Sequence, residues 1–324
     1  KKKYVNLKKK LKLIKSDKIL DIGSNDGTFL NFFKDQSFKV GCDPSSKKFR
    51  KYYNKDIRVY NSIFNNDFLK KLNKKFKLIS AIAMFYDLDK PIDFCHSVEN
   101  ILDLNGIFHV EVAYLPDILS KYSFDTFCQE HLTYFSYISF CNLLKKTNLR
   151  IVDYSRNSIN GGSINFDLVL NSSKIKSKTK KLKKLHNKEI KNNLNKLTTY
   201  KNYFKKIEIN MNNISTKIKN LSKKNKIYCF GASTKGNVTL QLCDLDGEVI
   251  DGIYDVNKEK FNCFTPGTNI KIKNEKSITS DKPDYILFLI WHFKKTIKEK
   301  FKYFNLKKTK YIWLFPKLKI SKKI

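Results

Sequence analysis

Arginine is almost absent from this chain of 324 residues, although its formal net charge at pH 7 is +35. Arginine is the side chain best suited to bidentate contacts with bases and phosphates, so a charge carried by lysine argues poorly for specific nucleic-acid recognition. We therefore interpret most of the charge as solvated lysine, which still favours anionic small molecules, and we predict no nucleic-acid partner. The arginines are Arg50, Arg58, Arg150 and Arg156.

Paired cysteines and long apolar runs are missing as well. The seven cysteines form no C-x-x-C pair, which excludes a zinc knuckle and predicts no metal site, and their odd, dispersed number is typical of a reducing cytoplasm. The longest apolar run, at 285–291, is too short to span a bilayer, so we expect no membrane association. The first residue is Lys1 rather than Met, from which we expect that a preceding segment is missing.

The chain does contain a glycine-punctuated turn between a strand and a helix, in the stretch ILDIGSNDGTFL at 19–30. Residues 19–22 are a short apolar run typical of a buried parallel strand, and Gly23 and Gly27 let the backbone approach a ligand closely. Residues 28–33 are expected to begin a helix. The turn lacks the G-x-G-x-x-G spacing of dinucleotide sites. Two interpretations remain: the turn binds a different cofactor, or it is an ordinary turn of an α/β protein.

The hydrophobic pattern predicts an α/β protein with two α/β domains joined by a helical connector. Strand-like runs alternate with helical segments through residues 1–170, which indicates a parallel sheet with right-handed crossovers. Residues 225–324 repeat this pattern as a smaller Rossmann-like domain, and residues 171–224 form the Lys-rich amphipathic connector. The expected strands are 18–22, 38–42, 57–60, 77–83, 106–112, 150–154 and 163–170 in the first domain, and 226–230, 249–254, 285–290 and 311–315 in the second.

Apolar residues recur every seven positions in the connector, in two rows three residues apart. This spacing predicts one long amphipathic helix. A helix packed on its own protein is favoured over a dimeric coiled coil, because the e and g positions lack charges of opposite sign. The rows are Ile190, Leu197, Phe204, Met211 and Ile218, and Tyr200, Ile207, Ile214 and Leu221.

Polar residues stand where the predicted strands end, the edge at which parallel sheets bind ligands. Asp43 ends the second strand at the spacing where an acidic residue binds ribose hydroxyls; alternatively, it caps a helix that begins at Pro44. Tyr86 lies in the loop after the fourth strand. Glu130 and His131 are adjacent and lie among aromatic residues, and a histidine near its ordinary pKa suits general-base work.

A second glycine loop, FGASTKGN at 230–237, has the features of a phosphate cradle. Backbone donors, hydroxyl groups and Lys235 precede a helix predicted at 238–243. The loop is not a Walker loop, because its last glycine is followed by Asn237 in place of lysine. It therefore favours a substrate that carries a pyrophosphate, and His292 is a second candidate histidine.

Together these segments resemble the S-adenosylmethionine (SAM)-dependent C-methyltransferases of nucleotide-activated deoxysugars, which act on dTDP-4-keto sugars. The turn at 19–30 resembles the first motif of class I SAM methyltransferases, and Asn25 in its middle glycine position is the residue that this family places there. The resemblance implies a class I Rossmann-like SAM domain and a smaller Rossmann-like substrate domain. The matching segments are LDIGSNDGTFL (20–30), MFYDLDKP (84–91), FDTFCQEHLTYFS (124–136), NGGS (160–163), FGASTKGN (230–237), TPGT (265–268), PDYILFLIWHF (283–293) and LFPKL (314–318).

The resemblance also implies a reaction and residue roles. A base removes the acidic proton next to the C4 ketone, and the enolate then attacks the methyl group of SAM. His131 would be the base, with Glu130 supporting it or the sugar hydroxyls, and Tyr86 or Asn160 would donate to the ketone oxygen. Cofactor binding is implied for Asp21, Gly23, Ser24, Asn25, Gly27, Asp43 and Met84, and binding of the nucleotide diphosphate for Ser233, Lys235, Asn237 and His292.

Two departures from that family are visible. No cysteine-rich zinc-binding domain precedes the glycine turn, which again indicates a missing N-terminal portion. Cys128 and Gln129 replace the Tyr and His that precede the Glu-His pair in well-studied members, so the sugar and the methylated carbon stay open. Two other functions remain as alternatives: an RNA methyltransferase, suggested by the charge, and a non-catalytic ligand-binding or assembly protein built on the long helix.

Overall fold

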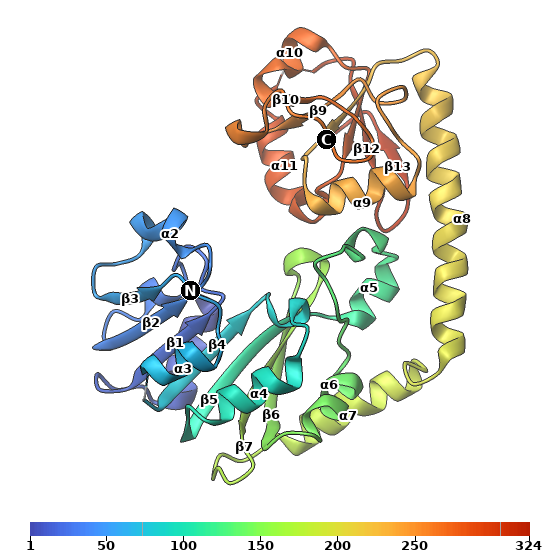
Figure 1. Ribbon diagram of the computed structural model, residues 1–324. Coiled ribbons are helices and arrows are strands. Elements are labelled where there is room, and N and C mark those ends of the chain that lie inside the picture. Colours follow the sequence, from blue (N-terminus) through green and yellow to red (C-terminus); the bar gives the residue numbers. More distant parts are fainter. Residues whose placement is uncertain (73, 305) are drawn as a thin grey trace. The chain divides into compact units, whose positions relative to one another are not determined.

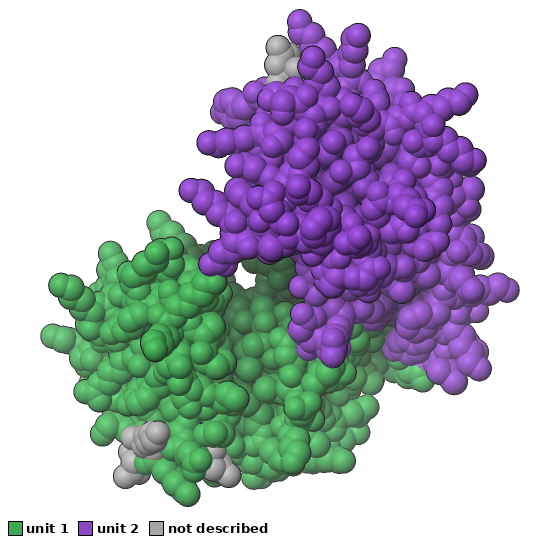
Figure 2. Space-filling view, turned by 45° about the horizontal axis from the view of Figure 1, so that its top comes forward, with its two compact units in different colours: residues 1–116, 132–195 green, residues 117–131, 196–324 purple. Residues whose placement is uncertain are grey.

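Two compact units make up the computed structural model, which describes residues 1–72, 74–304 and 306–324 (Figure 1). Unit 1 comprises Lys1–Pro116 and Leu132–Asn195, and unit 2 comprises Asp117–His131 and Lys196–Ile324, as coloured in Figure 2. The short stretch that ends at His131 therefore belongs to the second unit, although the sequence places it within the first half of the chain.

Within the described residues, unit 1 is built on a seven-stranded sheet in the order β3-β2-β1-β4-β5-β7-β6. The strands from β3 to β5 pair in parallel, and β7 runs antiparallel to both of its neighbours. This confirms the parallel sheet and the closing pair of strands that the sequence predicts. The strands are β1 (Lys18–Ile22), β2 (Phe38–Cys42), β3 (Ile57–Tyr60), β4 (Phe76–Ile82), β5 (Leu102–Ala113), β6 (Leu149–Asn157) and β7 (Ser163–Leu170).

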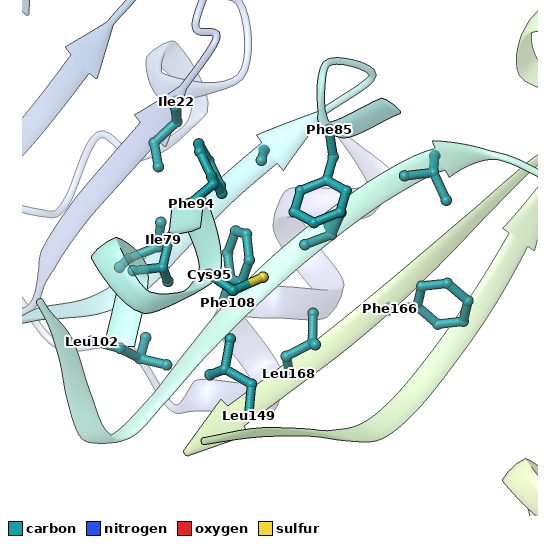
Figure 3. Close-up of a cluster of buried hydrophobic side chains, with 14 of the residues drawn as sticks. Ile22, Ile79, Phe85, Phe94, Cys95, Leu102, Phe108, Leu149, Phe166 and Leu168 are labelled. Atoms are coloured by element: carbon teal, nitrogen blue, oxygen red, sulfur yellow. The ribbon is translucent and has the colours of Figure 1, made fainter. Parts of the chain in front are cut away.

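Large apolar side chains from these strands and the adjoining helices form the core of unit 1 (Figure 3). Phe85 and Phe94 contact each other edge to face with 5.7 Å between ring centroids, and Ile79 and Phe108 are fully buried. Burying a side chain of this size contributes about 1.5–3 kcal/mol. The helices that begin in unit 1 are α1 (Lys2–Leu11), α2 (Ser46–Phe49), α3 (Asn66–Leu72), α4 (Pro91–Glu99), α5 (Leu115–Lys121), α6 (Tyr137–Leu144) and α7 (Thr179–Lys191).

The helix predicted at 28–33 is wrong, because this segment contains only a 3₁₀ turn, Leu30–Phe32. Phe32 and Phe33 are held by ring contacts with Tyr4 of α1, at centroid distances of 6.0 and 4.8 Å. Aromatic residues are weak helix formers, so these tertiary contacts decide the backbone conformation.

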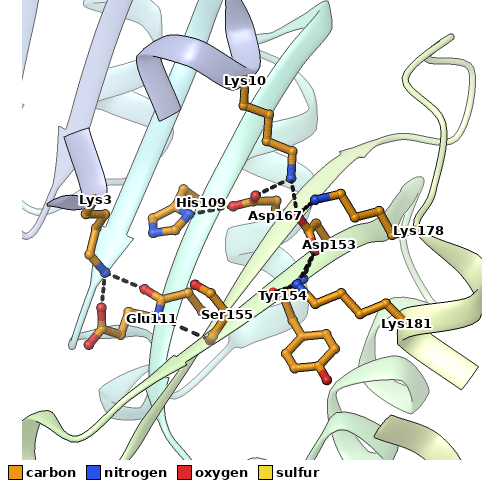
Figure 4. A network of polar contacts seen from close by, with 11 residues as sticks. Lys3, Lys10, His109, Glu111, Asp153, Tyr154, Ser155, Asp167, Lys178 and Lys181 are labelled. Atoms are coloured by element: carbon orange, nitrogen blue, oxygen red, sulfur yellow. Dashed lines mark hydrogen bonds and ion pairs between the residues drawn. The ribbon is translucent and has the colours of Figure 1, made fainter. Parts of the chain in front are cut away.

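Helix α1 is attached to the sheet of unit 1 by ion pairs (Figure 4). Lys3 pairs with Glu111 of β5, and the Nζ of Lys10 lies 3.0 Å from Asp153 and 2.5 Å from Asp167. Carboxylates that are largely buried need such partners, because an unpaired charge away from water is costly. The first helix is thereby linked to the strands that follow the glycine turn in the chain.

In the part of the chain that the structure describes, unit 2 has a six-stranded sheet ordered β10-β9-β8-β11-β12-β13. The pairing is parallel except at β13, which confirms the second α/β sheet. The sequence pattern misses β10 and β13, because three residues are too few to show an alternation. The elements are α8 (Leu197–Ser222), β8 (Ile227–Phe230), α9 (Thr234–Leu242), β9 (Gly252–Asp255), β10 (Ile272–Asn274), α10 (Ile278–Asp281), β11 (Tyr285–Phe288), α11 (Lys294–Phe301), β12 (Lys310–Trp313) and β13 (Lys319–Ser321).

The connector contains two helices where the heptad pattern predicts one. Helix α7 ends at Lys191 and α8 begins at Leu197, and Asn193 between them adopts the left-handed region at φ 53°. Ile207 and Ile214 of α8 are buried in the core of unit 2, so this helix packs on its own protein. Leu197, in the first heptad row, is 68% exposed. Among the described residues, no helix is long and apolar enough to cross a membrane.

Candidate active site

The glycine turn of unit 1 uses the left-handed backbone region at every second residue. Gly23, Asn25 and Gly27 have φ values of 71°, 46° and 74°. Glycine adopts this region without strain, and asparagine is among the few other residues that tolerate it. This explains why Asn25 can replace the middle glycine of the motif without altering the path of the turn.

The turn is anchored to the end of β2 by Asp43. The N–H of Asn25 donates to Oδ2 of Asp43 at 2.9 Å, and Oδ1 accepts from both the N–H and the hydroxyl of Ser45. A carboxylate offers about four acceptor positions, so about one remains for a ligand hydroxyl. Helix α2 begins at Ser46, and Asp43 therefore shapes the turn before that helix instead of capping it at Pro44.

Tyr53 is a residue of this site that the sequence analysis missed. Its hydroxyl lies 2.8 Å from Oγ of Ser24 and donates to the carbonyl of Asn25 at 2.7 Å. Its ring covers the turn so closely that a Cβ on Gly27 would lie 2.5 Å from a ring carbon. No motif in the sequence marks Tyr53, since it precedes β3 in an irregular segment.

The loop after β4 closes on the same turn. Ala83 has a positive φ of 58°, a strained value for a residue with a Cβ, and such strain is concentrated at functional sites. A Cβ added to Gly23 would lie 2.8 Å from Cγ of Met84. The structure thus brings the predicted cofactor residues Gly23 and Met84 into direct contact.

Asp21 lies beneath the turn, in β1. Asp21 is 3% exposed, and its carboxyl accepts a hydrogen bond of 2.6 Å from Ser80 of β4. Burial raises the pKa of Asp21 to about 7, although the Ser80 hydrogen bond and the charge of Lys3 both oppose this shift. Asp21 therefore supports the strand ends from below and titrates close to neutral pH.

Tyr86 and Asn160 are both in unit 1. The main-chain carbonyl of Tyr86 accepts hydrogen bonds from Leu132 and Thr133 at 3.0 and 3.1 Å, which attaches the loop after β4 to the residues that directly follow His131. Asn160 has a φ of 52° within the 3₁₀ turn between β6 and β7.

In unit 2, the second glycine loop is shorter than expected because α9 begins at Thr234. Lys235 and Asn237 are therefore in the first helical turns, and Oγ of Ser233 caps the helix by accepting from the N–H of Gly236 at 3.1 Å. A helix N-terminus carries a partial positive charge, and the Lys235 ammonium adds a full one. This end of α9 can bind an anion.

The ring of His131 is held by a main-chain carbonyl. Its Nδ1 lies 2.9 Å from the carbonyl oxygen of Thr126. Because a carbonyl only accepts, Nδ1 carries the proton, and the neutral ring has its lone pair on Nε2. Burial and the nearby Lys235 lower the pKa of His131, although the Thr126 hydrogen bond and Glu130 oppose this. Glu130 itself is exposed.

His292 completes the predicted set in unit 2. Burial, with a further contribution from the Lys235 charge, lowers the pKa of His292 to about 4, so this ring is neutral at pH 7. Its Nδ1 and the Oδ1 of Asn237 are buried and have no hydrogen-bond partner among the described residues. Buried polar atoms of this kind are uncommon in folded proteins, and they are suited to groups of a bound ligand.

Asp125 and Trp291 were also missed from the sequence. The Nε1–H of Trp291 donates to Oδ2 of Asp125 at 2.8 Å, and Asp125 is fully buried. Burial raises the pKa of Asp125. Both residues lie within motifs of the family resemblance, but an isolated aspartate and an isolated tryptophan carry no spacing that could predict the contact.

Two family models cover nearly the whole chain. Residues 3–154 match the methyltransferase domain, and residues 158–316 match the C-methyltransferase C-terminal domain. The chain belongs to the SAM-dependent C-methyltransferases. The C-methyltransferase NovU from Streptomyces niveus is 25% identical over 286 residues, which are 87% of this chain and 68% of NovU. The expected class I methyltransferase fold with a second α/β domain is confirmed, and SAM is the cofactor of this enzyme.

Solved structures also resemble part of this C-methyltransferase. One is the complex between the Haloferax volcanii Trm112 methyltransferase activator and the putative methyltransferase, at 15% identity and a TM-score of 0.43 over 50% of this chain and 87% of that chain. A SAM-dependent methyltransferase from Clostridium acetobutylicum has 15% identity and a TM-score of 0.40 over 52% of this chain and 89% of that chain. Both scores are below 0.5, so these likenesses carry no argument about function.

Proposed function

We propose that this C-methyltransferase methylates a carbon next to the ketone of a nucleotide-activated 4-keto deoxysugar. The observation that carries the proposal is the hydrogen bond between Nδ1 of His131 and the Thr126 carbonyl, which places the lone pair of the neutral ring on Nε2. Burial lowers the pKa of His131 and so favours this neutral form. A carbon becomes nucleophilic only when it loses a proton, and the ketone makes the adjacent proton acidic. A neutral histidine with a set tautomer is the base that this step requires.

The nucleotide diphosphate is proposed to bind at the N-terminus of α9. Lys235 and the capped first turn supply positive charge and backbone donors. The buried polar atoms of Asn237 and His292 would then receive hydroxyl or phosphate groups of the same ligand. Ser233 would act mainly by fixing the helix end, because its hydroxyl already serves as the cap.

The cofactor is proposed to bind at the glycine turn of unit 1. The remaining acceptor position of Asp43 suits the ribose diol, and Gly23 and Gly27 allow close approach of the backbone, with Met84 beside them. SAM supplies an electrophilic methyl group when bound. Asp21 would support this arrangement from below through its hydrogen bond with Ser80.

The ketone oxygen gains negative charge as the proton leaves and needs a hydrogen-bond donor. Tyr86 and Asn160 are the proposed donors, since each has a side-chain donor and lies in a loop at the end of a strand. Glu130 is proposed to support substrate hydroxyls, because its exposure keeps it available to solvent and ligand.

The base can be tested without methyl transfer. Wild-type protein, His131→Asn and the control His186→Asn, in which the replaced histidine lies on α7, are incubated in D₂O with dTDP-4-keto sugars. Deuterium uptake next to the ketone is expected with wild type and the control, and a loss of about 10²–10⁴-fold is expected with His131→Asn. Uptake at the wild-type rate in His131→Asn would remove His131 as the base. No uptake by wild type with any sugar of the panel would contradict the proposed substrate class.

A further inference from the structure

One hydrogen bond in unit 2 joins two segments that are 166 residues apart in the sequence. The indole Nε1–H of Trp291 donates to Oδ2 of Asp125 at 2.8 Å. Asp125 is the middle residue of the 3₁₀ turn η4 (Phe124–Thr126), and Trp291 opens the turn η8 (Trp291–Phe293) that follows β11. The bond therefore fixes η4 against the turn that follows β11.

The turn η4 is also the element that holds His131. The carbonyl that accepts from Nδ1 of His131 belongs to Thr126, the residue after Asp125. The ring of Phe124, the residue before Asp125, and the ring of Trp291 both contact Phe315, at centroid distances of 5.0 and 5.3 Å. The hydrogen bond and this shared aromatic contact thus hold η4 in place, and the Thr126 carbonyl also accepts from the N–H of Cys128 at 3.0 Å.

We propose that Trp291 and Asp125 are positioning residues that set the tautomer of His131 by holding the Thr126 carbonyl in place. The proton of a neutral histidine lies on whichever ring nitrogen has a suitable acceptor. If η4 shifts, Nδ1 loses its acceptor, and the proton can move to Nε2, where it blocks the lone pair. Asp125 is 0% exposed, and its effect on His131 is transmitted through η4.

The effect on the reaction rate rests on the proposed function of His131, whereas the effect on the tautomer does not. The primary test is therefore ¹⁵N NMR of protein labelled in its histidines, without substrate and at pH 8, with the His131 signals assigned from His131→Asn. The expected wild-type spectrum shows protonated Nδ1 and unprotonated Nε2 for His131.

Two variants remove the hydrogen bond and two controls keep it. Asp125→Leu has a similar shape but no acceptor, and Trp291→Phe keeps an aromatic ring but has no donor. Asp125→Asn keeps an acceptor oxygen for the indole. Tyr254→Phe deletes another side-chain hydrogen bond of unit 2, the one of 2.9 Å to Asp281, and serves as the control for general loosening.

In Asp125→Leu and Trp291→Phe, we expect the two His131 nitrogen signals to move towards each other as the second tautomer becomes populated. Asp125→Asn and Tyr254→Phe should keep the wild-type pattern. In methyl-transfer assays, kcat of the first two variants should fall about tenfold, less than the roughly 10²–10⁴-fold that a general base is worth, and the KM for SAM should not change.

The proposal is overturned if Trp291→Phe, folded by circular dichroism, keeps the wild-type tautomer, or if Tyr254→Phe disturbs it equally. It is also overturned if wild-type His131 carries its proton on Nε2. If Asp125→Leu does not fold, Trp291→Phe alone decides. A changed tautomer with unchanged kcat would instead contradict the role of His131 as the base, which separates the two failures.

Discussion

The two predicted binding regions of this C-methyltransferase are built in different ways. At the glycine turn of unit 1, Asn25 and Ser24 hydrogen bond within the unit, to Asp43 and Tyr53. Near α9 and η8 of unit 2, the buried Oδ1 of Asn237 and other polar atoms have no partner among the described residues. The first region, where we propose that SAM binds, is a turn, here called the cradle, whose hydrogen bonds form within its own unit. The second is a set of side chains that includes buried polar atoms without a hydrogen-bond partner among the described residues.

The largest effect on stability is expected at Gly27, where the Tyr53 ring leaves no space for a Cβ. In Gly27→Ala, the new Cβ would lie 2.5 Å from the Tyr53 ring at a φ of +74°. A left-handed alanine costs about 1–2 kcal/mol and overpacking about 1–3 kcal/mol. We expect unfolding free energy to drop by about 2–5 kcal/mol and SAM binding, measured by calorimetry, to be lost.

The matched change in unit 2 is Gly236→Ala, in the first turn of α9. Its Cβ would lie 3.1 Å from the carbonyl oxygen of Gly231 and from Leu289, a tight contact without backbone strain. Calorimetry should show unchanged SAM affinity for this variant. If Gly27→Ala bound SAM as well as Gly236→Ala does, the cradle would not be the SAM-binding site proposed above.

A smaller effect is expected from the carboxyl beneath the cradle. Burial raises the pKa of Asp21 to about 7, whereas an unfolded chain releases this proton near pH 4. Folded protein thus binds more protons than unfolded protein between these values, and stability falls as the pH rises through that window. Between pH 5 and pH 8, the unfolding free energy of wild type should fall by about 2.5 kcal/mol more than that of Asp21→Asn.

Urea denaturation at the two pH values measures this difference. Asp26→Asn is the control, because Asp26 belongs to the same turn but is only partly buried, and it should keep the wild-type pH dependence. Parallel behaviour of wild type and Asp21→Asn across the range would show that Asp21 does not titrate near neutral pH.

This contrast also explains what the sequence could predict. The strands of unit 1 and the left-handed turn can be recognised from short stretches of sequence. The predicted bounds are correct for β1, β2, β3 and β7, and Gly23 and Gly27 mark the turn directly. The helix predicted at 28–33 does not form, because the backbone there is set by a ring contact between Phe33 and the distant residue Tyr4. Tyr53 and Trp291 were missed for the same reason, because each acts through tertiary hydrogen bonds that leave no local sequence pattern.

The smallest effect is expected from removing the positive charge of Lys235, which lies near His131 and His292 in unit 2. Burial first, and then Lys235, lower the pKa of His292 and contribute to the lowered pKa of His131. In Lys235→Met, both pKa values should rise, because a protonated imidazole no longer faces a positive charge. The acid limb of the kcat profile should therefore move to higher pH, and the loss of activity should be greater at pH 6 than at pH 8.

The control for this change is Lys219→Met, which removes a partly exposed lysine of α8 that pairs with Asp244. It lowers the net charge of the chain equally but is expected to leave the acid limb in place. A limb that moves to lower pH in Lys235→Met, or that moves equally in both variants, would mean that Lys235 does not act on the histidine locally. Burial alone would then account for the lowered pKa values of His131 and His292.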